Sequence, residues 1–162
     1  KAVLKKRDID INEMVESIGN SFSLRVEHTG GKVYTEIEAI DSTIYVDEMH
    51  FQNVVFNLLD NAVKYRKPDQ PLNVYIRTWN EGKRVCLSIK DNGIGIKKDN
   101  LKKVFDKFFR VHTGNVHDVK GFGLGLSYVK KMVDLHEGEI HVESEFGEGT
   151  VFTIKLPFMD EN

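Results

Sequence analysis

Cysteine is almost absent from this sequence of 162 residues, which contains only Cys86. A single cysteine cannot form a disulfide within the chain, and its place in the strand-like run RVCLSIKD favours a buried apolar side chain over a reactive thiol. Long apolar runs are missing as well, since none reaches the ~18 residues that a membrane-spanning helix needs. No signal peptide opens the sequence. Within this sequence we therefore expect neither an internal disulfide nor a transmembrane helix.

An excess of charge of one sign is also lacking. The net charge is −2, so we expect no contact with nucleic acid or with a membrane surface. Hydrophobic residues make up 40% of the chain and charged residues 30%, which is typical of a globular domain with its own core. The length fits one domain. Because the first residue is lysine and not methionine, we expect a fragment of a longer protein.

The apolar residues recur with helical spacing in three segments and with strand spacing in several others. Helices are expected at about residues 11–21, 47–66 and 125–137. Strands are expected at about residues 23–28, 32–38, 44–46, 73–79, 85–90, 139–144 and 151–156. Strands and helices do not alternate as in a doubly wound parallel sheet. The order predicts an α/β (α+β) two-layer sandwich, with a mixed sheet and the helices on one face.

Polar side chains interrupt the second predicted helix in the run NLLDNAVKY. Its apolar residues form one stripe, while Asn57, Asn61, Lys64 and Tyr65 fall on a neighbouring stripe. Amide oxygens suit Mg²⁺, an ammonium group suits phosphate, and a tyrosine ring can pack against a flat base. The stripe would suit a magnesium nucleotide. For a pair of asparagines alone, a solvated polar helix face is the favoured explanation, so the stripe by itself does not decide between the two interpretations.

Glycine-rich segments follow later in the chain. DNGIGI places Asp91 at the end of a strand, where a buried carboxylate could accept a hydrogen bond from an amino group such as that of adenine, and Gly93 and Gly95 would let backbone approach a base. An ordinary Asp-Asn-Gly turn is the alternative.

Two more glycine-rich segments lie near the C-terminus. KGFGLGL opens a helix, where backbone N–H groups can bind phosphate, although a flexible hinge would also fit. FGEGT joins two strands, where a plain hairpin turn would fit. The P-loop and Rossmann glycine patterns do not occur, which disfavours those two sites.

The order of NLLDNAVKY, DNGIGI, VFDKFFR, KGFGLGL and FGEGT resembles the N, G1, F, G2 and G3 boxes of the catalytic ATP-binding domain of bacterial sensor histidine kinases. That domain belongs to a superfamily with the gyrase, heat-shock chaperone and mismatch-repair ATPases. The resemblance covers about residues 9–158 and implies a Bergerat-type fold, with a mostly antiparallel sheet of about five strands packed on three helices. It implies a linker over residues 1–8, a lid over about residues 97–120 and a tail over residues 159–162.

The resemblance also implies that ATP and Mg²⁺ are the cofactors. Asn61 and Asn57 would hold the metal, and the implied catalytic residues are Asn57, Lys64 and Arg110, with Arg110 reaching the γ-phosphate. Asp91 would bind the adenine amino group. The residues implied to bind the nucleotide are Asn57, Asn61, Lys64, Tyr65, Asp91, Gly93, Gly95, Ile96, Phe108, Gly121, Gly123, Leu124, Gly125, Leu126 and Thr150.

One position distinguishes a kinase from a hydrolase. The ATPases of the superfamily carry a glutamate, the general base for water, where this chain has Asn57. A carboxamide cannot take up a proton at neutral pH. The resemblance therefore implies a domain that binds Mg-ATP and passes its γ-phosphoryl group to a histidine. None of the six histidines lies in the family's acceptor motif, so we expect the acceptor on a separate dimerisation helix.

The implied partners are these upstream dimerisation and phosphotransfer helices and the receiver domain of a response regulator. We expect a cytoplasmic domain that is monomeric in isolation, from a parent that forms a homodimer. The alternatives are a serine kinase or anti-sigma type domain of the same fold, and a nucleotide-binding module that acts only by contacting a partner.

Overall fold

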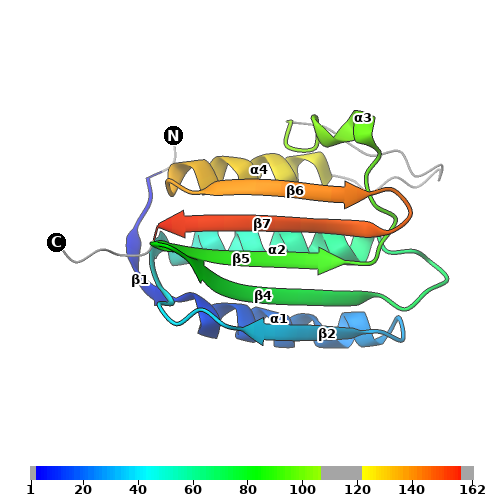
Figure 1. The fold of residues 1–162 in the computed structure, drawn as a ribbon, viewed down its shortest axis with the longest axis horizontal. Helices are drawn as coiled ribbons and strands as arrows, with labels where there is room; N and C mark the ends of the chain where they lie inside the picture. Colours follow the sequence, from blue (N-terminus) through cyan, green and yellow to red (C-terminus); the bar gives the residue numbers. More distant parts are fainter. Residues whose placement is uncertain (1–2, 107–121, 158–162) are drawn as a thin grey trace.

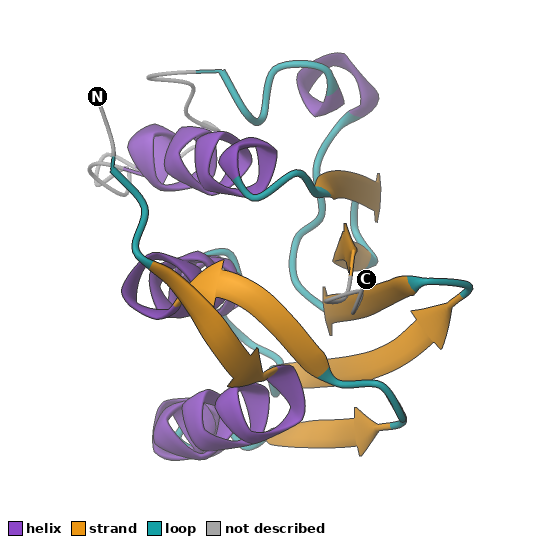
Figure 2. Cartoon of the chain, turned by 90° about the vertical axis from the view of Figure 1, so that its left-hand side faces the viewer, coloured by secondary structure: helices purple, strands orange, loops and turns teal. Residues whose placement is uncertain are grey.

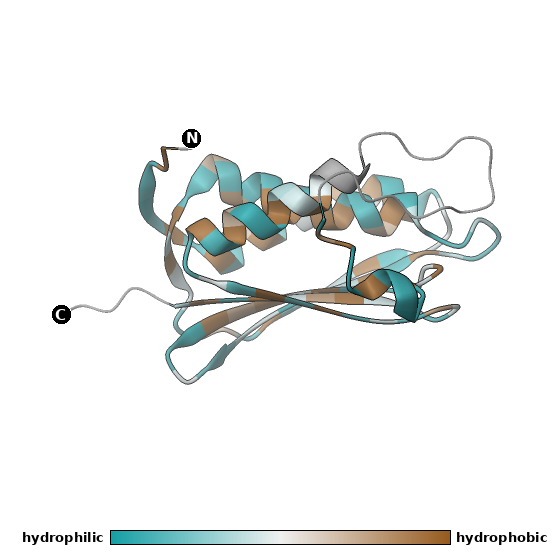
Figure 3. Cartoon of the chain, turned by 90° about the horizontal axis from the view of Figure 1, so that it is seen from above, coloured by the Kyte–Doolittle hydropathy of each residue, from teal (hydrophilic) through white to brown (hydrophobic). Residues whose placement is uncertain are grey.

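A five-stranded sheet forms one layer of the molecule, and three long helices cover one of its faces (Figures 1 and 3). The computed structural model describes residues 3–106 and 122–157. The strands of the sheet, in their spatial order, are β2 Lys32–Ile37, β4 Asn73–Glu81, β5 Arg84–Asp91, β7 Gly149–Pro157 and β6 Glu139–Glu145. The β2–β4 pair is parallel and the other three pairs are antiparallel. The predicted two-layer sandwich and both predicted hairpins, β4–β5 and β6–β7, are confirmed.

The helices bury one apolar stripe each against the sheet. The long helices are α1 Ile11–Glu27, α2 Glu48–Lys64 and α4 Phe122–Leu135, and a single turn, α3, spans Lys98–Leu101. In α2 the stripe read from the sequence is almost fully buried: Phe51, Val54, Val55, Leu58, Leu59 and Ala62. Aspartates cap α1 and α2, since Asp10 accepts a hydrogen bond from the Asn12 N–H and Asp47 accepts one from the His50 N–H. Within the described residues, no helix is long and apolar enough to cross a membrane.

A second, two-stranded sheet crosses one end of the helical layer (Figure 2). It pairs β1, Lys6–Asp10, with β3, Thr43–Asp47, in antiparallel register. Residues 6–8, which were expected to belong to a linker, are therefore part of a paired strand. The short strand expected at residues 44–46 exists, but it lies in this small sheet and not in the main one.

The strand predicted at residues 23–28 is wrong, because α1 continues to Glu27. Phe22 and Val26 are buried and extend the helical spacing of the preceding apolar residues. Leu24, which lies within the predicted strand, is 68% exposed. Helical periodicity over the longer window therefore decides the structure of this segment.

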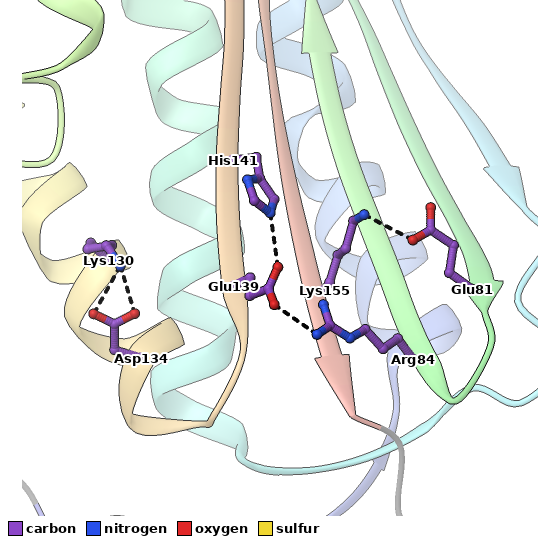
Figure 4. Close-up of polar contacts among 7 residues, drawn as sticks. All are labelled: Glu81, Arg84, Lys130, Asp134, Glu139, His141 and Lys155. Atoms are coloured by element: carbon purple, nitrogen blue, oxygen red, sulfur yellow. Dashed lines mark hydrogen bonds and ion pairs between the residues drawn. The ribbon is translucent and has the colours of Figure 1, made fainter.

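Ion pairs connect side chains of different strands on the sheet face that the helices do not cover (Figure 4). The Arg84 Nη2 atom of β5 lies 2.8 Å from the Glu139 Oε2 atom of β6 across the intervening β7, and the other oxygen of Glu139 lies 3.1 Å from His141 Nε2. Arg84 lowers the pKa of Glu139 to about 2, with His141 as the second contribution. His141 is therefore an exposed surface residue beside a carboxylate.

The end of α4 carries a strained residue that yields a stability prediction. Glu137 has φ 62°, in the left-handed region that disfavours side chains with a Cβ atom. We expect Glu137→Gly to raise the free energy of unfolding by about 0.5–1 kcal/mol, because glycine adopts this conformation without strain. Urea unfolding measures the change. Glu137→Ala is the matched control, since it also removes the carboxylate but keeps Cβ, and an equal gain from alanine would contradict the backbone explanation.

Candidate functional site

Four of the segments singled out in the sequence meet at one end of the molecule. The C-terminal end of α2, the loop after β5, the β6–β7 turn and the start of α4 all lie at the right-hand end of Figure 1. They come together because β5 ends where β6 turns into β7, and because α2 and α4 run antiparallel over the sheet. The fold therefore assembles the predicted site from distant parts of the chain.

Asp91 is the last residue of β5 and lies opposite Thr150 in the register with β7. Its Oδ1 atom accepts a hydrogen bond from the Gly93 N–H at 2.8 Å. Burial raises the pKa of the Asp91 carboxyl to about 6, and the backbone N–H groups of Gly93 and Thr150 act in the opposite direction. Burial removes hydrogen bonds between the Asp91 carboxylate and water. A hydrogen-bond donor on a ligand, such as an exocyclic amino group, would replace one of them and stabilise the ionised form.

The two loop glycines, Gly93 and Gly95, lie where the protein's own backbone segments approach each other closely. A Cβ atom on Gly93 would lie 2.5 Å from the Tyr65 carbonyl oxygen, and one on Gly95 would lie 2.3 Å from the Glu145 carbonyl oxygen. Both residues are therefore required by the close approach of the protein's own backbone.

Hydrogen bonds fasten this loop to its neighbours on both sides. The Ile94 N–H donates to the carbonyl of Tyr65 at the end of α2, at 3.0 Å, and the Gly147 N–H of the β6–β7 turn donates to the Ile94 carbonyl, at 2.7 Å. The Ile96 N–H donates to Ser144 Oγ at 2.7 Å. The loop and the turn thus form one continuous wall beside Asp91.

Ser144 is a site residue that the sequence analysis missed. Its hydroxyl donates to the Gly149 carbonyl at 2.8 Å and lies 2.8 Å from the hydroxyl of the buried Thr150, in addition to accepting from Ile96. A hydroxyl has one donor and two acceptor positions, so these three bonds satisfy it fully. The signal was present in the sequence, since Ser144 shares the inward-facing alternation of Ile140 and Val142 on β6.

Asn57 faces α4. Its Nδ2 atom donates to the Asn53 carbonyl at 2.8 Å, and its Oδ1 atom would lie 3.1 Å from a Cβ atom on Gly125. The absence of a side chain at Gly125 keeps the amide oxygen of Asn57 accessible at the start of α4. Asn61 is one helical turn further on and is partly exposed. The structure therefore brings both amides and Gly125 to the same end of the α2–α4 interface.

Lys64 points elsewhere. Its Nζ atom lies 3.0 Å from Asp60 Oδ2, and the other oxygen of Asp60 lies 3.0 Å from Arg25 on α1. This ion pair directs Lys64 towards α1, whereas Asn57 faces α4. The Lys64 side chain is 35% exposed, so its exchange from Asp60 to a phosphate group costs little.

The remaining candidate residues in α4 and in the predicted lid divide into three groups. Leu126 is 2% exposed and belongs to the hydrophobic core, so its side chain is not presented to a ligand. Gly123 and Leu124 lie in the first turn of α4, of which the backbone alone is described. The predicted roles of Phe108, Arg110 and Gly121, and most of the predicted lid, fall outside the described residues.

A metal ion would depend on amide oxygens. No group of three or more His, Cys, Asp or Glu side chains that could hold a metal occurs in the part of the chain that the structure describes. Mg²⁺ commonly takes one or two protein oxygens and completes its shell with phosphate oxygens and water. The accessible amides of α2 fit that requirement.

Comparisons with known proteins agree with this geometry. The family described as histidine kinase-, DNA gyrase B- and HSP90-like ATPase matches residues 46–160. The chain is 57% identical over 159 residues to the sensor protein RprX of Bacteroides fragilis, covering 98% of this chain and 31% of RprX. It is 36% identical over 121 residues to the sensor histidine kinase WalK of Bacillus subtilis, covering 75% of this chain and 20% of WalK. The chain thus spans about a third or less of the length of these relatives.

Solved structures share the fold over almost the whole chain. Full-length ShkA in complex with AMPPNP has a TM-score of 0.82 at 26% identity, covering 99% of this chain and 32% of that one. Histidine kinase ThkA in complex with the response regulator protein TrrA has a TM-score of 0.75 at 20% identity, covering 97% of this chain and 43% of that one. Because the family match covers more than half of the chain, the chain belongs to the histidine kinase-, DNA gyrase B- and HSP90-like ATPase family.

Proposed function

We propose that this chain binds Mg-ATP and donates the γ-phosphoryl group to a histidine on a separate dimerisation helix, as the catalytic domain of a sensor histidine kinase. The phosphoryl group would then pass to the receiver domain of a response regulator on the cytoplasmic side of the membrane. RprX and WalK, which are named as sensor proteins, support this assignment within the family. Calorimetric titration with Mg-ATP tests the binding step, and labelling of a supplied acceptor tests the transfer step.

The observation that carries the proposal is the amide of Asn57 at the α2–α4 interface, with Asn61 one helical turn further on, together with the partly buried carboxylate at the end of β5. Asn57 directs its amide oxygen towards Gly125, and Asp91 has a pKa raised by burial. This arrangement gives one end of the site to phosphate and metal and the other to a base with an amino group.

The same residues favour transfer over hydrolysis. Hydrolysis of ATP needs a base that takes a proton from water, and the amide of Asn57 cannot serve as one. An imidazole acceptor is itself a nucleophile, so its reaction depends chiefly on positioning and on stabilisation of the developing charge. A bound Mg²⁺ would supply part of that charge stabilisation.

Replacing Asn61 should uncouple nucleotide binding from the metal. In the proposed site Asn61 gives its side-chain oxygen to Mg²⁺, so we expect Asn61→Ala to lose most of the gain in ATP affinity that Mg²⁺ provides. Titrations in Mg²⁺ and in EDTA measure the ratio of the two affinities. Gln52→Ala, an exposed amide earlier on α2, is the control that should leave this ratio unchanged. A parental ratio in the Asn61→Ala variant would exclude Asn61 as the ligand.

ATP binding should weaken in acid. The pKa of Asp91 is raised from 3.8 to about 6. In the unliganded protein, the free energy of unfolding therefore decreases as the pH rises from about 4 to about 6, because the folded state disfavours the ionised carboxylate. Binding of an amino group needs the ionised form. We therefore expect the affinity for ATP to be highest above pH 6 and to fall by about tenfold per pH unit well below it.

The Asp91→Asn variant separates this effect from the titration of ATP itself. The variant cannot titrate at residue 91, so it should retain only the pH dependence that comes from the nucleotide. Calorimetric titration of both proteins across pH 5–8 gives the comparison. If the affinity for ATP changes with pH by the same factor in the parent and in the variant, Asp91 does not cause the pH dependence.

A further inference from the structure

The interface between α2 and α4 contains polar contacts that the nucleotide site does not use. The two helices lie side by side and run antiparallel between the end of the molecule where β1 lies and the end where β6 turns into β7 (Figure 1). Asn57 faces Gly125 in this interface, and two further pairs lie between it and the other end: Asp47 with His136, and His50 with Tyr128. We call this set the α2–α4 seam.

His136 and Asp47 form the buried end of the seam. His136 follows α4 and is 4% exposed, and its Nε2 atom accepts a hydrogen bond from the backbone N–H of Asp47 at 3.0 Å. Its Nδ1 atom lies 2.7 Å from the Met132 carbonyl, which can only accept, so Nδ1 carries the proton. The neutral imidazole with its proton on Nδ1 is the one form that makes both bonds. Burial lowers the pKa of His136, which favours that neutral form.

Asp47 connects this junction to the start of α2 and to the entry of the chain. Its carboxylate accepts from the His50 N–H at 3.1 Å, which caps α2, and from the Lys5 N–H at 2.8 Å, just before β1. Asp47 is 6% exposed, so both bonds are shielded from water. The end of α4, the start of α2 and the backbone that leads into β1 therefore share one buried group of hydrogen bonds.

The seam continues towards the nucleotide end. The Nδ1 atom of His50 lies 2.7 Å from the Tyr128 hydroxyl. Two turns further along α2, Asn57 faces Gly125, where a Cβ atom would lie 3.1 Å from its Oδ1 atom. Apolar packing alone tolerates small slides of one helix along another, whereas hydrogen bonds between defined atoms fix the register.

We propose that His136 and Tyr128 are positioning residues that set the register of α4 against α2, and thereby the distance between Asn57 and the start of α4 on which Mg-ATP binding depends. This inference rests on the proposed function. A displacement of about 1 Å at a site where reacting groups are held can cost a large factor in binding and rate, so contacts far from the nucleotide can act on it.

The test compares two buried polar residues of similar setting. His136→Leu removes the acceptor for the Asp47 N–H, and His136→Gln restores an acceptor oxygen at a similar reach. Thr78→Val is the matched control, because Thr78 is fully buried and bonds Asn12 and Ala39 on the α1 side, away from the seam. Urea unfolding and calorimetric titration with Mg-ATP are measured for each variant of the 162-residue chain.

We expect both His136→Leu and Thr78→Val to unfold more easily than the parent. The affinity for Mg-ATP should fall by about three- to tenfold in His136→Leu alone and should largely recover in His136→Gln. If His136→Leu does not fold, the milder Tyr128→Phe, which keeps the ring and removes the hydroxyl, should still lower the affinity by about two- to fivefold.

Two results would overturn the inference in distinguishable ways. Parental affinity for Mg-ATP in both His136→Leu and Tyr128→Phe would show that the seam is structural only, with the proposed function intact. A parent chain that binds no Mg-ATP would overturn the proposed function and this inference together.

Discussion

Asp91→Asn should weaken ATP binding by at least about 1–3 kcal/mol, or roughly five- to 150-fold. Asparagine keeps the size of the side chain and can still accept the hydrogen bond from the Gly93 N–H. Its amide group, however, can present a donor to the donating amino group of adenine and leave both unsatisfied. Calorimetric titration of parent and variant with Mg-ATP measures the loss.

Two comparisons sharpen this prediction. Asp134→Asn, an exposed carboxylate on α4 that pairs with Lys130 at 2.8 Å, is the control and should leave the affinity unchanged (Figure 4). The Asp91→Asn variant should also lose its preference for ATP over GTP, because guanine carries a carbonyl where adenine carries the amino group. Unchanged affinity in the Asp91→Asn variant would refute the adenine role.

Arg110→Ala should reduce phosphoryl transfer by at least about a hundredfold while leaving much of the Mg-ATP binding intact. Under the proposed function Arg110 reaches the γ-phosphoryl group, whose charge changes most in the transition state. Transfer is measured as labelling of a supplied acceptor helix with γ-labelled ATP, and binding is measured by calorimetry on the same protein.

Arg77→Ala is the matched control for this variant. Arg77 is an exposed arginine of β4 that pairs with Glu38 at 3.1 Å, away from the candidate site. Its replacement should leave both binding and transfer close to the parental values. An Arg110→Ala variant whose transfer and binding fall by the same factor would instead assign Arg110 to ground-state binding.

The parts of the fold that the sequence predicts correctly are those with strong local patterns. The buried stripe of α2 has unbroken helical spacing, and the β4–β5 and β6–β7 hairpins alternate cleanly around glycine-containing turns. Asp91 could be placed because a strand pattern ends directly before a glycine turn. In each case neighbouring residues in the chain contain the whole signal.

The parts that the sequence does not predict depend on distant partners. The pairing of β1 with β3 joins segments more than 30 residues apart, and nothing local marks Lys6 and Arg7 as a strand. The direction of Lys64 depends on Asp60 and on Arg25 of another helix. At the end of α1, polar and apolar residues alternate around Leu24 as in a strand. The burial of Phe22 and Val26, with Leu24 exposed, shows that the helix continues through this segment.

The most direct measurement of the central claim uses γ-labelled Mg-ATP with this chain, alone and together with the histidine-bearing helical segment of its parent as a separate chain. If the proposed function is correct, the chain alone takes up no acid-labile phosphate and hydrolyses ATP slowly, and the added segment becomes labelled. Transfer between separate chains should be much slower than in the joined protein, because linkage raises the local concentration of the acceptor to the mM range. Robust labelling of a histidine within the isolated chain, or rapid turnover of ATP with no acceptor present, would contradict the proposed function.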